Sequence, residues 1–413
     1  MNLFPFVVLF WFSLSRAEEV SDILDVYCSG PGAPTPFPIP ATNSSPALTL
    51  TQLHVLVRHG DRTPSNPFHA LGNATWNCSG TMSLQGANAG GASSVRMFNM
   101  AAWANTNPLP GTCLLGQLTP RGAKQHTANG VGLLTSYTDF LSQITDPSQV
   151  YVRASQYQRT WDSATALLAA AFPQLKTKKS LVLHQVETRY DGIFSPMNCD
   201  TFVDIASNLS MTYPPLIDFI ANELAPAVEG LAAQLNLSLA DAQDAVFNSA
   251  DGWACYHCHN KPLPINRTQL ASLVTLMYKY YSIQSLSPTY QSFQNGQLFY
   301  EMEQIFQQQQ QKKFVLWSGH DSTLQSVLAG IGAYPTTQWP PYAAHLRFEV
   351  WEEPIPNGFS YVRAIYNNEV LTLTPSFCSG GTLCPWEGFL KLLQSGQPEG
   401  WRQRCYQAPY PFF

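Results

Sequence analysis

The sequence predicts an α/β fold: a sheet core flanked by helices, into which a smaller and mostly helical domain is inserted. Three apolar strands, followed by helical patterns, predict the sheet core. A long Ala- and Leu-rich stretch with hardly any strand signal predicts the insertion. Hydrophobic residues make up 45% of the 413 residues and charged residues only 12%, a balance typical of a folded globule rather than a disordered chain.

The N-terminal residues predict a secretory signal peptide over residues 1–17. Residues 3–12 are apolar but too short to span a bilayer, and small residues up to Ala17 offer a cleavage site. Residues 31–40 are rich in proline. We therefore expect residues 18–46 to form an extended leader without hydrogen-bonded structure.

The folded body starts with a β-rich run over residues 48–57, which stops at Arg58. A second strand over residues 150–152 ends at Arg153 and leads into a helical pattern over about residues 157–172. Both strands therefore end on an arginine that lies at the edge of the predicted sheet.

A third strand over residues 314–317 ends shortly before His320 and Asp321, and residues 323–328 then predict a helix closed by Gly330. In α/β sheets, ligands gather outside the carboxyl ends of the strands. The polar side chains predicted to lie there are Arg58, His59, Arg153, His320 and Asp321.

These elements predict the domain organisation. Residues 47–194 and 307–413 form a Rossmann-like sheet core with helices around it, and this core carries the site. Residues 195–306 form the helical insertion, which we expect to lie over the sheet as a cap.

Residues 57–64 carry the chemistry of the first strand end. Arg58 and Arg62 bracket His59 within five residues, and planar guanidinium groups match the oxygens of a phosphate monoester with paired hydrogen bonds. A neutral imidazole can attack phosphorus with one nitrogen while the other holds the proton. The alternative is a surface turn whose arginines pair with acids such as Asp61, but two further strand ends carry matching groups.

The third strand end carries a candidate proton donor. When a phosphate monoester is cleaved, the departing alkoxide needs a proton, and Asp321 is the candidate general acid if burial and the negative charge of the substrate raise its pKa. An acidic working pH would favour this role. His320 is expected to donate a hydrogen bond to the phosphate rather than to bind a metal; the alternative is a core histidine satisfied by the backbone.

The sequence Arg-His-Gly-Asp-Arg-Thr-Pro with a distant His-Asp pair resembles the histidine acid phosphatase family, over about residues 48–405. The resemblance implies a phosphoglycerate-mutase-like architecture, His59 as nucleophile, Asp321 as proton donor and no cofactor or metal. The phosphate ligands that it implies are Arg58, Arg62, Arg153 and His320.

Two assignments near the motifs are less specific. Arg153 resembles the family's third phosphate arginine, although Arg159 is a nearby competitor; we favour Arg153 because it ends the strand. Asp61 stands where the family varies, so we assign it local hydrogen bonding at the turn and no catalytic role.

The segment at residues 255–259, Cys-Tyr-His-Cys-His, also matches the haem attachment pattern of c-type cytochromes, and its cysteines and histidines could hold zinc. We favour disulfide bonding, because an exported chain needs disulfides and no second pair of metal ligands stands at a suitable spacing. The overlapping sequence Cys-His-Asn at residues 258–260 also resembles the family's phosphoxylose phosphatase branch, a hint about ancestry rather than substrate.

The cysteines and sequons place the chain in the secretory pathway, either secreted or lysosomal. Nine cysteines leave at least one unpaired in the chain, Cys378 and Cys384 are spaced for a local loop disulfide, and Cys405 is expected to tie the C-terminal tail to the body. The Asn-X-Ser/Thr sequons are Asn43, Asn73, Asn77, Asn208, Asn236 and Asn266.

The charge pattern limits the partners. The net charge is −5 and the only compact basic run covers residues 176–179, so we expect no nucleic-acid partner; beyond the signal peptide, no run is long enough to span a membrane. The expected partner is a small phosphate monoester, with a homodimer left open. The functional alternatives are a phytase, for which 22 Lys and Arg are few, a sugar-phosphate phosphatase of the same family, and an inactive secreted anion-binding homologue.

Overall fold

The structure is a computed structural model of the chain. It describes residues 23–42, 48–65, 74–79, 109–175, 181–186, 191–194, 196, 199–308, 311–333, 339–354, 358–374, 376–378 and 380–405. The predicted signal peptide lies outside the described residues, as do the sequons at Asn43 and Asn73.

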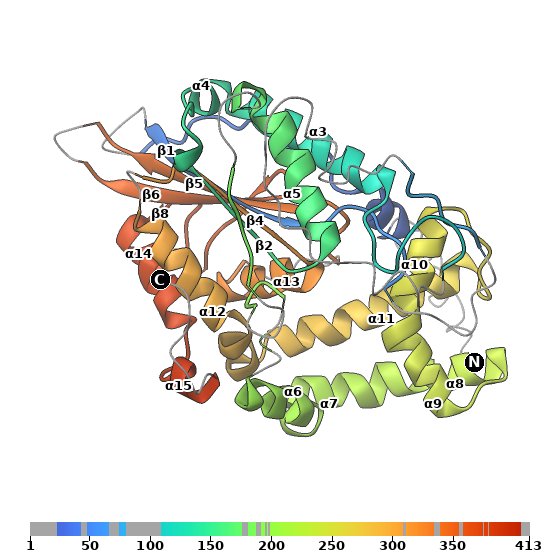
Figure 1. Cartoon of the computed structure of the whole chain (residues 1–413). Helices are drawn as coiled ribbons and strands as arrows, with labels where there is room; N and C mark the ends of the chain where they lie inside the picture. The colour runs from blue at the N-terminus through green and yellow to red at the C-terminus, as the bar shows by residue number, and fades with distance from the viewer. Residues whose placement is uncertain are drawn as a thin grey trace, which may run out of the picture.

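One mixed sheet forms the centre of the molecule, in the order β3-β2-β4-β1-β5-β6-β7, with β8 paired to β6 (Figure 1). Strands β1 to β4 are mutually parallel, and β5 to β8 add an antiparallel half. The strands are β1 (Thr49–Arg58), β2 (Val150–Ala154), β3 (Leu183–His184), β4 (Phe314–Gly319), β5 (His345–Glu352), β6 (Ser360–Tyr366), β7 (Glu369–Val370) and β8 (Cys384–Pro385). The three predicted strands are confirmed, and the antiparallel half was not predicted.

Helices cover both faces of the sheet, as predicted (Figure 1). On one face α3 (Pro120–Ser136) and α5 (Gln158–Ala171) bury Leu133 and Leu167 against Val55 and Val152 of the parallel strands. α3 begins where the Thr119 side chain accepts the N–H of Gly122, with a proline at the first helical position. The short helices beside them are α4 (Thr138–Ser142), η2 (Pro147–Gln149) and η3 (Pro173–Leu175).

The other face is covered by α12 (Pro288–Phe306), α13 (Asp321–Gly330) and α14 (Trp386–Ser395). Phe299 and Phe306 of α12 join the apolar cluster of this face with Trp317 and Phe348 of the sheet. The expected insertion ended at residue 306, but α12 packs with the core because its apolar side chains are buried on the sheet. The C-terminal elements are η7 (Ser376–Cys378) and α15 (Trp401–Cys405).

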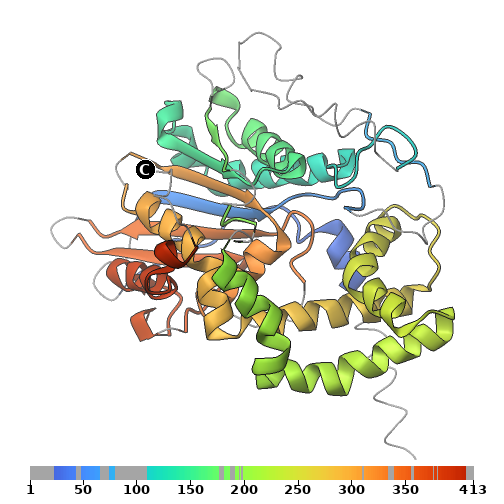
Figure 2. The ribbon, with the colours of Figure 1, turned by 60° about the horizontal axis from the view of Figure 1, so that its bottom comes forward.

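The insertion is helical, as its composition predicts. It lies beside the edge of the sheet at which the parallel strands β1 and β4 end (Figure 2). Its own apolar cluster includes Leu231, Val246, Trp253 and Leu270. Its helices are α6 (Asp200–Thr212), α7 (Pro214–Phe219), the π-helix η5 (Ile220–Leu224), α8 (Ala225–Leu235), α9 (Leu239–Asp244), the π-helix η6 (Ala245–Ser249), α10 (Ala250–Cys258) and α11 (Arg267–Ser285).

The leader differs from the expectation of an extended segment without hydrogen bonds. Residues 23–29 are helical, and Leu24 and Tyr27 are buried in the apolar cluster of the insertion. Residues 34–42 have no regular secondary structure but are bonded to the body: the backbone of Thr35 contacts Asn368 and Arg347. The leader is therefore a packed part of the fold, because these side chains satisfy its backbone groups.

The described residues contain four disulfides: Cys28–Cys258, Cys78–Cys113, Cys199–Cys405 and Cys378–Cys384. The local loop disulfide and the anchoring of the C-terminal tail are thereby confirmed. Cys255 is free and buried, as the odd count required of at least one cysteine. Among the described residues, no helix is both long and apolar enough for a membrane span.

Candidate active site

The ends of β1 and β4 meet at one edge of the sheet and carry the two halves of the predicted site. In their parallel register Arg58 lies opposite Gly319, so His59 and His320 both follow directly after the strand ends. The backbone N–H of His59 donates to the Gly319 carbonyl at 2.9 Å, and the two imidazole rings lie 5.5 Å apart between centroids. Residues far apart in sequence are thus brought together as predicted.

The His59 ring is oriented and kept neutral by its surroundings. Its Nδ1 lies 2.8 Å from the carbonyl oxygen of Gly60, which can only accept, so Nδ1 carries the proton and the lone pair is on Nε2. Burial, with the positive charges of Arg159 and Arg58 added to it, holds the pKa of His59 well below its usual range. The side chain therefore presents a nucleophilic nitrogen.

Three buried arginines act electrostatically on His59: Arg58, Arg62 and Arg159. Each has a buried Nε atom with no hydrogen-bond partner among the described residues. Burial, followed by the like charge of Arg62, lowers the pKa of Arg159 to about 10. Clustered cations with buried, unpaired donors suit a polyvalent anion such as phosphate.

Arg58 and Arg62 are each held by a carboxylate. Nη2 of Arg58 lies 2.9 Å from Oδ2 of Asp321, and its Nη1 donates to the carbonyl of Pro340 at 2.6 Å. Nη2 of Arg62 lies 2.7 Å from Oδ2 of Asp251, a residue of α10 in the insertion. The insertion therefore contributes a charged group directly to the site.

Arg153 is placed elsewhere, which corrects the choice made between it and Arg159. Its guanidinium is paired with Asp191 at 2.7 Å and with Glu301 of α12 at 3.4 Å, and Nη1 donates to Ala154. Side chains alternate along a strand, and Val152 faces α5, so Arg153 points to the opposite face. Arg159, at the start of α5, takes the place beside His59.

His320 and Asp321 lie where α13 begins. Nε2 of His320 contacts the Ser155 hydroxyl at 2.8 Å, and burial lowers the pKa of this imidazole well below its usual range, with further lowering by nearby arginines. Burial acts to raise the pKa of Asp321, but the charges of Arg58 and Arg62 outweigh burial and hold that pKa below its usual range. The ionised form of Asp321 is therefore favoured in the site as it stands.

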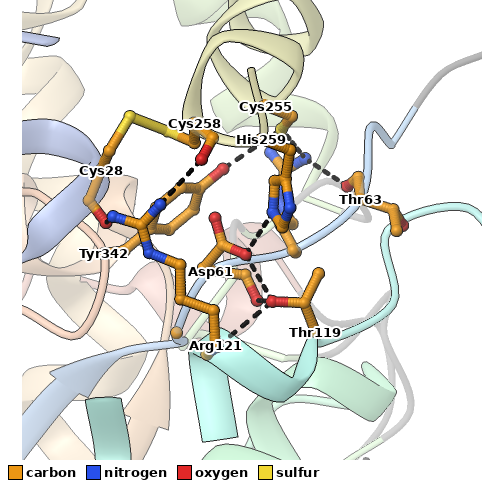
Figure 3. Close-up of polar contacts among 12 residues, drawn as sticks. Cys28, Asp61, Thr63, Thr119, Arg121, Cys255, Cys258, His259 and Tyr342 are labelled. Atoms are coloured by element: carbon orange, nitrogen blue, oxygen red, sulfur yellow. Dashed lines mark hydrogen bonds and ion pairs between the residues drawn. A yellow bond between two sulfur atoms is a disulfide. The ribbon is translucent and has the colours of Figure 1, made fainter. Parts of the chain in front are cut away.

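Asp61 makes more than the local turn contacts expected of it (Figure 3). Its carboxylate accepts from the Thr119 hydroxyl at the start of α3 and contacts Nε2 of His259, at the end of α10, at 2.7 Å. Asp61 thus connects the loop that follows β1 both to α3 of the core and to the insertion. Among the described residues, none of these side-chain contacts of Asp61 is to the imidazole of His59.

The segment at residues 255–259 is neither a haem attachment site nor a disulfide within itself. Cys258 is bonded to Cys28, so one of the two sulfurs that a haem would need is already consumed. Disulfide bonding was thus correct for Cys258 and wrong for Cys255, whose Sγ lies 3.5 Å from Nη1 of Arg62 and 3.1 Å from the Tyr342 hydroxyl. No group of three or more metal-ligating side chains occurs in the described part of the chain.

Two groups of the site were not found from the sequence. Asp251 lies in the insertion, and Tyr27 lies in the leader, where its hydroxyl contacts both Arg58 and Asp251. Neither belongs to a motif, and only their contacts in the fold reveal them. Arg159 could have been preferred because it lies in the first turn of the helix that follows the end of β2.

The sequence profile of the histidine phosphatase superfamily (branch 2) matches residues 49–222 and 224–367. Counting factor 60 of Dictyostelium discoideum is 26% identical over 98% of this chain and 98% of its own length. The 2-phosphoxylose phosphatase 1 of Xenopus tropicalis is 25% identical over 90% of this chain and 78% of its own. The lysosomal acid phosphatase of Bos taurus is 28% identical over 72% and 74%, respectively.

A solved structure supports the fold. The phytase from Citrobacter braakii superposes with a TM-score of 0.59 at 14% sequence identity, covering 86% of this chain and 99% of the phytase. At this identity the likeness concerns the fold alone, and it agrees with the predicted architecture. With most of its residues matched by the family profile, the chain belongs to branch 2 of the histidine phosphatase superfamily.

Proposed function

We propose that this phosphatase hydrolyses phosphate monoesters by transferring the phosphoryl group to Nε2 of His59, with Asp321 as the proton donor. The observation that carries the proposal is the neutral His59 among three buried arginines whose Nε–H donors have no partner in the described part of the chain. Such donors stabilise charge that develops on the phosphoryl oxygens in the transition state. Arg58, Arg62, Arg159 and His320 are the proposed phosphate ligands, with Arg159 in place of Arg153.

In the first half-reaction, Nε2 of His59 attacks phosphorus, a P–N bond forms and the ester P–O bond breaks. Asp321 donates its proton to the departing alkoxide and becomes a carboxylate. The phosphate oxygens offset the charges of Arg58 and Arg62 that lower the pKa of Asp321, so substrate binding itself favours the protonated acid. An acidic medium adds to this effect.

In the second half-reaction, water attacks phosphorus and the P–N bond breaks. The Asp321 carboxylate accepts the proton of the attacking water, which restores the acid and releases inorganic phosphate. His59 returns to its neutral form, still oriented by the Gly60 carbonyl. No cofactor is needed for either step.

The charges around the site favour substrates with a single phosphate group over polyphosphorylated ones. Asp251 places a carboxylate, 24% exposed, beside Arg62, and a second phosphate close to it would be repelled. A phytase-like substrate is therefore disfavoured. Sugar phosphates such as those acted on by the 2-phosphoxylose phosphatase relatives remain within the class that the site accommodates.

We place this activity in the secretory pathway, whether the chain is secreted or lysosomal. Four disulfides require an oxidising compartment to form, and one relative is a lysosomal acid phosphatase. All proposed groups come from one chain, so the chemistry requires neither a homodimer nor a nucleic acid. The substrate is a small molecule.

The test is the variant His59→Ala. It should release no phosphate above background from p-nitrophenyl phosphate, while its thermal unfolding midpoint stays close to that of the wild type. Unchanged turnover would contradict the mechanism. Saturable phosphate binding by the wild type without any turnover would instead support an inactive anion-binding homologue.

A further inference from the structure

The hydroxyl of Tyr27 lies between the two ion pairs of the site. Nη2 of Arg58 donates to this hydroxyl at 3.0 Å, and the hydroxyl donates to Oδ1 of Asp251 at 3.2 Å. The Tyr27 ring lies 4.8 Å from the Arg58 guanidinium carbon and 4.7 Å from the ring of Tyr342. Tyr27 is only 3% exposed, so it is built into the site.

This residue comes from outside the part of the chain that the family profile matches, which begins at residue 49. The leader carries Tyr27 to the site on its short helix, and the backbone carbonyl of Tyr27 accepts the N–H of Tyr342 at 3.1 Å. We infer that Tyr27 is a positioning residue: it orients Arg58 toward the phosphate and holds Asp251 in register with it. This inference rests on the proposed function of Arg58 as a phosphate ligand.

Tyr27 can orient Arg58 because one nitrogen of the guanidinium lies close to two different acceptors. The same Nη2 atom that donates to Tyr27 lies 2.9 Å from Asp321, the proposed general acid. A second, neutral acceptor keeps the guanidinium from turning wholly toward that carboxylate. Without the hydroxyl, Arg58 loses a fixed orientation that phosphate binding would have to restore.

A disulfide holds this residue in place. Cys28, the next residue after Tyr27, is bonded to Cys258 of α10 (Figure 3). The same helix carries Asp251 two turns earlier. Arg121 of α3 donates to the carbonyl of Cys28 at 2.8 Å and to that of Cys258 at 2.7 Å. The disulfide therefore fixes the leader and α10 together against the core, with Tyr27 and Asp251 side by side.

The primary test is Tyr27→Phe, which keeps the ring, the disulfide and the backbone contacts. We expect KM for p-nitrophenyl phosphate, and the inhibition constant of inorganic phosphate, to rise about tenfold, as for the loss of one hydrogen bond to a charged group. The value of kcat should stay within about twofold, because substrate binding already completes the orientation of Arg58, so the lost hydroxyl affects the ground state and the transition state equally. An unchanged KM overturns the inference.

Tyr137→Phe is the matched control. The hydroxyl of Tyr137 likewise bridges an arginine and a carboxylate, Arg347 at 3.0 Å and Glu349 at 2.6 Å, but it contacts no group of the site. This variant should lower the thermal unfolding midpoint and leave KM unchanged. A tenfold rise in KM here would show that losing any such bridge affects KM, and would overturn the specific role of Tyr27.

A second test concerns the disulfide. Removing it in the double variant Cys28→Ser, Cys258→Ser should raise KM about as much as Tyr27→Phe does, and adding Tyr27→Phe to that background should raise it no further. Additive effects would show that the disulfide and Tyr27 act independently. If the serine variant fails to fold, Tyr27→Phe alone decides. A wild type without phosphatase activity would instead refute the proposed function.

Discussion

At the scale of single residues, the difference between Arg153 and Arg159 shows which features allow an arginine to serve as a phosphate ligand. Both lie near the end of β2, but strand alternation sends Arg153 toward the carboxylates of Asp191 and Glu301. Arg159 lies in the first turn of α5 and acts on His59. A phosphate ligand must have a free hydrogen-bond donor, and the Nε of Arg159 has no partner among the residues that the structure describes.

We therefore expect Arg159→Met and Arg153→Met to behave differently. Arg159→Met should lower kcat/KM for p-nitrophenyl phosphate by about 10²–10³, the usual effect of removing a donor to a transition-state oxyanion. Arg153→Met should lower the free energy of unfolding by about 3–5 kcal/mol, because two buried carboxylates lose their partner. Steady-state kinetics and urea unfolding measure the two effects. The reverse pattern would restore Arg153 as the ligand.

The proposed role of Asp321 as general acid is tested by comparing esters with different leaving groups. Asp321→Asn should lower kcat for an alkyl phosphate by about 10²–10⁴, because an alkoxide needs a proton to depart. For p-nitrophenyl phosphate the rate of phosphorylation should fall far less, since nitrophenolate leaves without taking up a proton. The initial burst of nitrophenolate measures this rate. Equal loss of this step for both esters would exclude Asp321 as the donor to the leaving oxygen.

At the scale of elements, the loop that follows β1 is held in place by its close approach to the first turn of α3. A Cβ on Gly122 would overlap the backbone of Asp61, and one on Gly60 would overlap the backbone of Gly122. Two glycines are therefore needed where the loop after β1 crosses the start of α3. This packing holds His59 relative to the helix.

Gly122→Ala should for this reason lower the free energy of unfolding by about 1–3 kcal/mol and lower kcat/KM as the loop shifts. Gly230→Ala is the matched helical control: outside its own helix turn, no described residue lies within 4 Å of the added Cβ, so the substitution should stabilise the protein by about 0.4–1 kcal/mol with unchanged kinetics. Urea unfolding and steady-state kinetics compare the two. Equal effects of both substitutions would refute the role of the close approach.

The sequence predicted the elements whose patterns are local. The three strand ends, α5, α13 and the helical insertion follow from apolar runs and turn residues in single segments. The antiparallel half of the sheet and the helix at residues 23–29 depend on distant partners and were missed. The same holds for the site: His59 and His320 follow from motifs, whereas Tyr27 and Asp251 are placed by tertiary contacts and a disulfide.

At the scale of the whole molecule, buried histidines make the folded protein less stable at the acidic pH that favours the proposed mechanism. Burial lowers the pKa of His126 to about 4 and that of His345 to about 3. Both remain neutral in the folded protein while the unfolded chain takes up protons below about pH 6.5. Their contribution to stability is therefore complete above pH 6.5 and is lost as the pH falls toward 4.

We expect the free energy of unfolding to fall between pH 6.5 and 4, by up to about 1.4 kcal/mol per pH unit for each such histidine. His126→Gln removes one titrating group and keeps a donor for the Arg58 carbonyl, 3.0 Å from Nε2 of His126. Urea unfolding across this pH range should then show a shallower slope than in the wild type. An unchanged slope would show that His126 does not contribute.

The covalent intermediate on His59 is tested most directly by mixing the protein with p-nitrophenyl phosphate, quenching in alkali, where phosphohistidine survives, and locating the phosphoryl group by peptide mass spectrometry. We predict a phosphoryl group on the peptide that contains His59 in the wild type, a higher occupancy in Asp321→Asn and none in His59→Ala. A phosphoryl group on another residue, or phosphate release by His59→Ala, would contradict the mechanism.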